Sequence, residues 1–153
     1  MDQCWTSPAV RARETAAALG LSPTVDERLK DCDFGRWAGL RFNQLIVREP
    51  LAFVAWVRNP SQAPHGGETI PQVMARVADW IDERGRSKGG GHMVAITHAS
   101  VIRAAILHVI QAQLPSFWRI DVLPLSRTEL RTNGRRWVFR AMGEISPHDH
   151  DHT

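Results

Sequence analysis

Long apolar runs are missing from the sequence, and we expect neither a membrane-spanning segment nor a secretory leader. No stretch approaches the roughly 18 consecutive apolar residues that a helix needs to cross a bilayer. Residues 1–5 carry neither the basic nor the apolar region of a signal peptide. These absences argue against an integral membrane protein and a secreted one. They predict a cytoplasmic protein with no membrane partner.

Cysteine and lysine are also scarce. Cys4 and Cys32 are the only cysteines and form no Cys-x-x-Cys pair, so we expect two reduced thiols rather than a disulfide framework. Lys30 and Lys88 are the only lysines among 19 basic residues. Arginine presents a rigid fork of donors that suits phosphate oxygens, although an arginine-rich composition can equally reflect genomic base composition. The basic residues form no run and the net charge is only +3, so no nucleic-acid partner is expected.

The composition is that of one globular domain. The 153 residues are 43% hydrophobic and 23% charged, enough to bury a core. There is no internal repeat and no linker. We expect a single domain over residues 1–145 and a disordered His/Asp-rich tail over residues 146–153.

Strand-like and helix-like segments alternate along most of the chain. Strands are expected at 3–6, within 24–30 and, as a buried strand, at 92–97; helices are expected at 8–19, 41–48, 51–57, 70–84 and 100–111. Ser7 is expected to cap the first helix and Gly20 to end it. The rest of the chain is expected to form a β-hairpin region with extended segments at 118–123, 127–131 and 136–141. The turn of the hairpin is expected at Asn133-Gly134. This order of strands and helices predicts a three-layer α/β/α sandwich. Its sheet is expected to be mostly parallel, with a C-terminal antiparallel hairpin.

Two strand-to-helix junctions share one design. One strand leads into Ser7 and a helix bearing Arg11; another leads into Thr97 and His98 at the start of the next helix. Free N–H groups and the helix dipole at such junctions favour an anion. An arginine and a histidine that converge there predict a phosphate pocket. The alternatives are an ordinary surface arginine and a structural histidine.

Five segments, in order, resemble the histidine phosphatase (phosphoglycerate-mutase-like) superfamily. Segment 6–16 is similar to its "SSPLxRAxQTA" motif, 29–39 to "LxExxFGxWEG" and 64–69 to "PxGGES", with Arg76 at the right distance. Segment 94–100 matches the strand that ends in its "TH" histidine, and 118–129 resembles its terminal strand region. The resemblance implies a phosphoglycerate-mutase-like fold and a small phosphorylated molecule as the partner.

The resemblance also implies roles for individual residues. Arg11 matches the arginine that binds phosphate oxygens, and His98 the second catalytic histidine, which stabilises the transferring phosphoryl group. Asp31 stands where the family has a glutamate general acid or base, and its alternative role is to cap the loop. Further candidates are Ser7 and Thr97 as phosphate-binding hydroxyls and Glu68 as a substrate-loop carboxylate; Thr97 and Glu68 could equally serve as helix caps. No metal or other cofactor is expected.

One departure bears on activity. The family's nucleophile is the histidine of an Arg-His-Gly motif on an earlier strand, and no Arg-His-Gly occurs in this sequence. We therefore expect an N-terminally truncated phosphomonoester hydrolase, an incomplete chain without the nucleophilic histidine. The alternatives are a non-catalytic phosphate or phospho-ligand binding or regulatory module, and a chain whose missing strand comes from a partner, such as a second copy in a homodimer. A third hypothesis is zinc or nickel binding by the tail 147–152.

Overall fold

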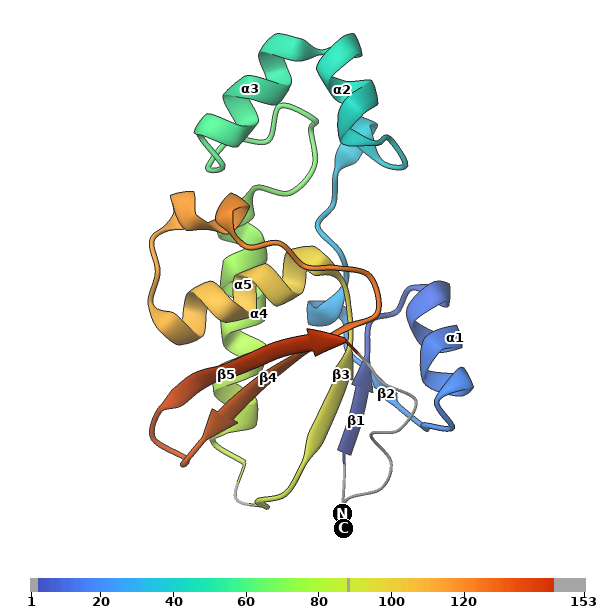
Figure 1. Ribbon diagram of the computed structural model, residues 1–153, viewed down its shortest axis with the longest axis vertical. Coiled ribbons are helices and arrows are strands. Elements are labelled where there is room, and N and C mark those ends of the chain that lie inside the picture. The colour runs from blue at the N-terminus through green and yellow to red at the C-terminus, as the bar shows by residue number, and fades with distance from the viewer. Residues whose placement is uncertain (1–2, 88, 145–153) are drawn as a thin grey trace.

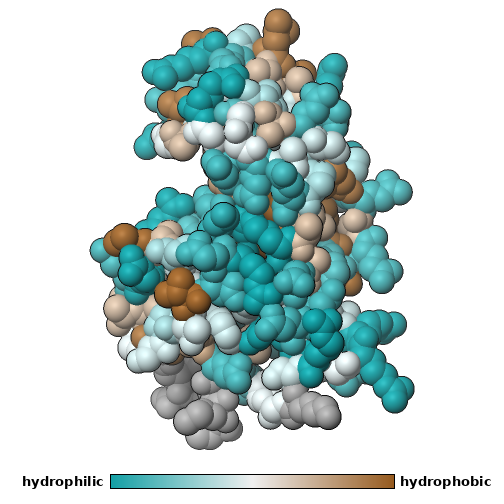
Figure 2. Space-filling view, turned by 180° about the vertical axis from the view of Figure 1, so that it is seen from behind, coloured by the Kyte–Doolittle hydropathy of each residue, from teal (hydrophilic) through white to brown (hydrophobic). Residues whose placement is uncertain are grey.

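The computed structural model describes residues 3–87 and 89–144, arranged as a body with a smaller lobe above it (Figure 1). The expected tail at 146–153 and its metal-site hypothesis lie outside the described residues. Among the described helices, none is both long and apolar enough to span a membrane. Figure 2 shows mostly hydrophilic residues across the junction of body and lobe, and hydrophobic residues on the lobe.

The body is built on a parallel sheet. Strands β1 (Gln3–Thr6), β2 (Thr24–Val25) and β3 (Met93–Ile96) lie in the order β2-β1-β3. The chain passes from β1 to β2 on one side of it, and then crosses over β1 to reach β3 on the other side. Because such crossovers are right-handed, helix α1 (Val10–Ala18) and helix α4 (Ile70–Gly85) lie on opposite faces of the sheet (Figure 1). Helix α5 (Ala99–Ile110) packs beside α4.

Helix α4 shows why the sequence pattern was informative. Thr69 and Gln72 form a reciprocal capping box, and Pro71 occupies the first turn. The helix has apolar residues at helical spacing, and all of these are buried: Ile70, Val73, Val77, Trp80 and Ile81. The core forms where this stripe meets α5 and Phe117.

The lobe consists of α2 (Phe42–Arg48) and α3 (Pro50–Arg58) with the loops that lead to and from them. Its centre is Trp56, which is fully buried. Six aromatic rings have their centroids 4.4–6.5 Å from the centroid of the Trp56 ring: Phe34, Trp37, Phe42, Phe53, Trp118 and His65. Aromatic packing therefore holds the lobe together and joins it to the body through Trp118.

The C-terminal strands form a separate antiparallel hairpin, β4 (Ser126–Thr132) and β5 (Trp137–Glu144). The predicted Asn133-Gly134 turn is confirmed, with Gly134 at φ +86°. Within the described residues, β3 pairs only with β1, and the hairpin pairs with neither. The prediction of a mixed α/β fold with a mostly parallel sheet and an antiparallel hairpin is confirmed.

Three local predictions were wrong. Helix α1 begins at Val10 rather than Pro8, and Ser7 is not its N-cap, because the Ser7 hydroxyl is engaged with the Ala9 N–H and with His98. Of the extended segment 24–30, only Thr24–Val25 is a strand; Glu27–Leu29 is a 3₁₀ turn that Asp26 caps. Strand β3 was expected to be buried, yet Val94 is 41% exposed, because no described strand covers its second edge.

The predicted strand at 118–123 is also absent. Leu114–Arg119 forms a 3₁₀ helix instead, with Pro115 in its first turn. Aromatic residues favour strands on average, but Phe117 is buried in the core and the Trp118 ring packs against Trp56. Tertiary packing of these two rings overrides the local preference.

Candidate functional site

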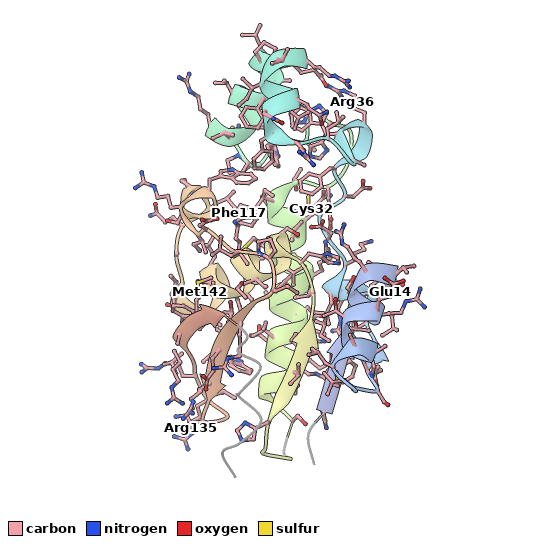
Figure 3. All side chains as sticks on the ribbon, turned by 45° about the vertical axis from the view of Figure 1, so that its right-hand side comes forward. Glu14, Cys32, Arg36, Phe117, Arg135 and Met142 are labelled. Atoms are coloured by element: carbon pink, nitrogen blue, oxygen red, sulfur yellow. The ribbon has the colours of Figure 1, made fainter. Side chains whose placement is uncertain are left out.

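The carboxyl ends of β1 and β3 lie side by side. Thr6 pairs with Ile96, and the Ser7 N–H donates to the Ile96 carbonyl at 2.9 Å. The residues that follow each strand therefore meet at one edge of the sheet, where ligands of open α/β sheets bind. Figure 3 shows that Cys32, next to Asp31 in the chain, lies at the junction of body and lobe. This junction is the candidate site.

The predicted meeting of Arg11 and His98 is present in the structure. Arg11 Nη2 lies 3.1 Å from His98 Nδ1 and 3.3 Å from Asp31 Oδ2. The Arg11 side chain is 72% exposed, so its guanidinium is free to turn toward a ligand. Their roles in binding phosphate stay predictions.

His98 is buried and held through both ring nitrogens. Nδ1 faces Arg11, and Nε2 lies 2.7 Å from the Ser7 hydroxyl. Because a guanidinium only donates, Nδ1 must accept, and the proton of the neutral ring is on Nε2, which donates to Ser7 Oγ. Burial lowers the pKa of His98, and the charges of Arg11 and Arg76 add to that effect, while Asp31 opposes it.

Ser7 is fully buried behind His98. Its oxygen also accepts the Ala9 N–H at 3.2 Å. This placement suits a residue that orients the imidazole; direct contact of Ser7 with phosphate stays a prediction.

Asp31 accepts hydrogen bonds on both carboxylate oxygens. Oδ1 accepts from the Ser100 hydroxyl at 2.6 Å and from the Cys32 N–H at 2.9 Å, while Oδ2 faces Arg11. The sequence reasoning missed Ser100; its position two residues after His98, in the first turn of α5, was the available signal. Burial raises the pKa of the neighbouring Cys32 thiol to about 12.

A clamp centred on Arg76 holds the loop that carries Asp31. The Arg76 guanidinium donates to the main-chain carbonyls of Arg28 and Asp31 and to both oxygens of Glu68. Burial alone would raise the pKa of Glu68, but the hydrogen bonds from Arg76 and from the Asp33 N–H hold it below its usual value. Glu68 is thus engaged in the clamp, and its role toward substrate stays a prediction.

Thr97 also makes a main-chain contact. Its hydroxyl donates to the Leu29 carbonyl at 2.6 Å, which ties the end of β3 to the segment before Asp31. This contact uses the hydroxyl hydrogen of Thr97. A phosphate-binding role for Thr97 stays a prediction.

Two glycines let the loop after Asp31 cross the loop before Glu68. A Cβ on Gly35 would lie 2.2 Å from the His65 carbonyl oxygen, and a Cβ on Gly67 would lie 2.1 Å from the Asp33 carbonyl oxygen. Gly35 also has φ +51°, which side chains rarely adopt. The crossing places Asp31 and Glu68 on two loops locked in contact.

One hollow borders the sheet and another borders the lobe. One, of about 400 Å³, lies at the amino ends of the strands beside Cys4 and Arg84, away from the candidate site. The other, of about 200 Å³, adjoins Asp31 under the lobe. No group of three or more His, Cys, Asp or Glu side chains able to hold a metal ion occurs in the described part of the chain.

Known proteins resemble this chain in sequence and in fold. The sequence profile of the histidine phosphatase superfamily (branch 1) matches residues 1–145. The chain belongs to the histidine phosphatase superfamily. This match confirms the family resemblance that the sequence motifs carried.

Among relatives in this superfamily, a bifunctional protein of Mycobacterium tuberculosis is 31% identical over 135 residues, covering 84% of this chain and 37% of that protein. Phosphoserine phosphatase 1 of Hydrogenobacter thermophilus is 27% identical over 144 residues, covering 91% and 68%. A mycobacterial glucosyl-3-phosphoglycerate phosphatase, solved as a complex with VO3, superimposes with a TM-score of 0.81 at 27% identity, covering 94% and 76%. The chain thus spans little more than a third of the bifunctional protein.

Proposed function

We propose that this chain forms the phosphoryl-binding site of a histidine-phosphatase-type phosphomonoester hydrolase. The observation that carries the proposal is the contact of Arg11 with both His98 and Asp31 at the carboxyl end of a parallel sheet. One cation, one imidazole and one carboxylate there match the needs of phosphoryl transfer: stabilisation of equatorial oxygens and proton delivery to the leaving oxygen. The VO3 complex of a structural relative supports an oxyanion ligand for this fold.

Binding requires a small change from the described geometry. A phosphate oxygen would accept from Arg11 in place of the Asp31 carboxylate and from His98 Nδ1. That nitrogen carries no proton in the neutral ring described above, so an anion would draw a proton onto it. Asp31 is the carboxyl group proposed to deliver a proton to the ester oxygen.

Hydrolysis through phosphohistidine also needs a nucleophile in line with the phosphorus. The sequence contains no Arg-His-Gly, and His98 is held from two sides by Ser7 and Arg11. We therefore propose that the nucleophilic histidine comes from a segment other than these 153 residues. In residues 3–87 and 89–144 no strand pairs with the second edge of β3, which supports a further strand at that position, from the same polypeptide or a partner. The alternative, favoured by the same missing motif, is a module that binds a phospho-ligand without turnover.

Phosphate binding and turnover of p-nitrophenyl phosphate by the purified 153-residue chain test these proposals. We expect vanadate and phosphate to bind and no turnover to occur. Failure of both anions to bind would overturn the phosphoryl site. Turnover that His98→Ala abolishes would overturn the external nucleophile. Genomic DNA in frame upstream of Met1 then separates hydrolase from binding module: an encoded Arg-His-Gly supports the hydrolase, and a stop codon close to Met1 supports the module.

A further inference from the structure

The cavity beside Asp31 has walls unlike the phosphoryl site. It measures about 200 Å³ and lies between Asp31 and the lobe. Apart from Asp31 and Gly39, every lining residue is apolar or aromatic: Phe34, Trp37, Leu40, Phe42, Leu45 and Trp56. Asp31 is therefore shared between this cavity and the cluster with Arg11 and His98.

The inner wall consists of closely packed, buried side chains. Trp37, Leu45 and Trp56 are at most 2% exposed, and the two indole rings pack edge to face at 5.6 Å. The Trp37 indole N–H donates to Glu49, which fixes the orientation of its ring. Phe42 is 50% exposed and forms an outer edge. A preformed wall costs little ordering entropy when a ligand binds.

The charge of the lining limits what can enter. Among the described residues that line the cavity there is no arginine or lysine, and the only ionisable side chain is the Asp31 carboxyl. A carboxylate in the cavity would lose hydration without gaining a cationic partner and would face Asp31. An apolar group, by contrast, would gain contact with the aromatic wall.

We propose that this cavity takes the alcohol part of the phosphomonoester, and that this part is an uncharged, ring-sized apolar group. The inference rests on the proposed function: the phosphoryl group lies at Arg11 and His98, the ester oxygen at Asp31, and the alcohol beyond it. The size is adequate, since an apolar cavity of about 150 Å³ holds benzene. The carboxylate of a substrate such as phosphoserine would have no cation to pair with in this cavity.

Non-hydrolysable phosphonates test the proposal without requiring turnover. Calorimetry would compare methylphosphonate, benzylphosphonate and phosphonoacetate on the full chain. We expect benzylphosphonate to bind at least about tenfold more tightly than methylphosphonate, because a phenyl ring leaves water for an apolar wall. Phosphonoacetate should bind no better than methylphosphonate. Equal affinity of the benzyl and methyl compounds, or tighter binding of phosphonoacetate, would overturn the proposal.

Variants of the wall locate the effect. Leu40→Trp fills the cavity and Phe42→Ala opens its edge; both should reduce the benzyl preference and leave methylphosphonate affinity unchanged. Phe139→Ala, the same change on the partly exposed hairpin, is the matched control and should keep the preference. Loss of the preference in the control but not in the wall variants would place the ring elsewhere.

A neutral probe separates failure of the cavity from failure of the phosphoryl site. Benzyl alcohol should shift the indole NMR signals of Trp37 and Trp56 at millimolar concentration, and Leu40→Trp should abolish the shift. If no phosphonate binds but these signals respond, the proposed function fails while the apolar cavity stands. If the signals do not respond and phosphonates show no benzyl preference, the cavity proposal is wrong.

Discussion

Arg11 Nη2 lies 3.1 Å from Nδ1 of His98, and this contact fixes which nitrogen of the imidazole carries the proton. The guanidinium cannot accept, so the free protein holds a neutral His98 with its proton directed at Ser7. An anion that replaces Arg11 at Nδ1 would reverse this preference. Under the proposed function, phosphate binding would therefore be coupled to protonation of His98.

The first prediction concerns that coupling. In the free chain His98 should titrate below the usual histidine pKa of about 6.5, because of burial and the charges of Arg11 and Arg76. Arg11→Met should raise the pKa of His98, and saturating phosphate should raise it in the unsubstituted chain. Ring ¹H–¹⁵N NMR spectra recorded against pH measure both shifts. Arg13→Met, on the same helix, is the control; an unchanged pKa with phosphate bound would contradict the coupling.

The second prediction concerns phosphate affinity. Arg11→Met should weaken phosphate binding by about 10- to 150-fold, since a hydrogen bond to a charged group contributes roughly 1.5–3 kcal/mol. Arg13→Met, also exposed on α1, should leave the affinity unchanged. Calorimetric titration with phosphate at constant pH measures both. Equal losses in the two variants would indicate general electrostatic attraction rather than a specific contact.

The third prediction concerns the clamp that holds the Asp31 loop. Arg76 and Glu68 are 14% and 15% exposed, so Arg76→Met leaves a carboxylate largely buried without its partner. The expected loss in unfolding free energy is about 3–5 kcal/mol, as for other broken buried ion pairs. Urea unfolding measures it. The double variant Arg76→Met/Glu68→Leu should recover part of the loss, and Arg131→Met, from an exposed pair, should cost under about 1 kcal/mol. A loss for Arg76→Met no greater than for Arg131→Met would contradict the clamp.

The fourth prediction concerns pH and stability. Burial lowers the pKa of His65 as well as that of His98. The unfolded chain therefore takes up these protons first, and the free energy of unfolding should fall as pH drops below about 6.5, toward the folded pKa values. Above that pH the contribution is fully present. Urea midpoints between pH 5 and 8 measure the slope.

Two matched variants test whether His65 causes the slope of unfolding free energy against pH. His65→Asn keeps an acceptor for the Gly67 N–H that His65 Nδ1 now accepts, and removes one titrating group, so the slope should decrease. His108→Asn, at a half-buried surface position, is the matched control. A slope that His65→Asn leaves intact would mean that other groups are responsible.

The fifth prediction concerns the crossing of the two loops. Gly67→Ala should destabilise the fold by more than about 1–3 kcal/mol, because its Cβ would meet a main-chain oxygen that cannot move without shifting the Asp31 loop. Gly89→Ala, where a Cβ meets nothing within 4 Å, is the control and should be near neutral. Thermal unfolding measures both. Similar melting temperatures for the two variants would show that the loops part without cost.

Much of the fold, and the pairing of two residues of the site, could be predicted from the amino-acid sequence. Helix α4 followed from the helical spacing of its apolar residues, and the Asn133-Gly134 turn from local conformational preference. Arg11 and His98 were placed together because each follows a parallel strand, and the carboxyl ends of parallel strands share one edge of the sheet. These are local or periodic properties, and the sequence carries them directly.

Other features depended on contacts between distant segments. Ser100 became part of the site only when the Asp31 loop packed against α5, 69 residues apart in the chain. The segment at Phe117 and Trp118 became a 3₁₀ helix because its rings are buried against the core and Trp56, and the aromatic cavity exists only where the lobe meets Asp31. The sequence by itself determined most of the helices and strands, and it indicated which side chains follow the parallel strands. The tertiary structure decided which side chains contact His98, which form the Arg76 clamp and which line the aromatic cavity. Those contacts join residues far apart in the chain, and no local sequence pattern indicates them.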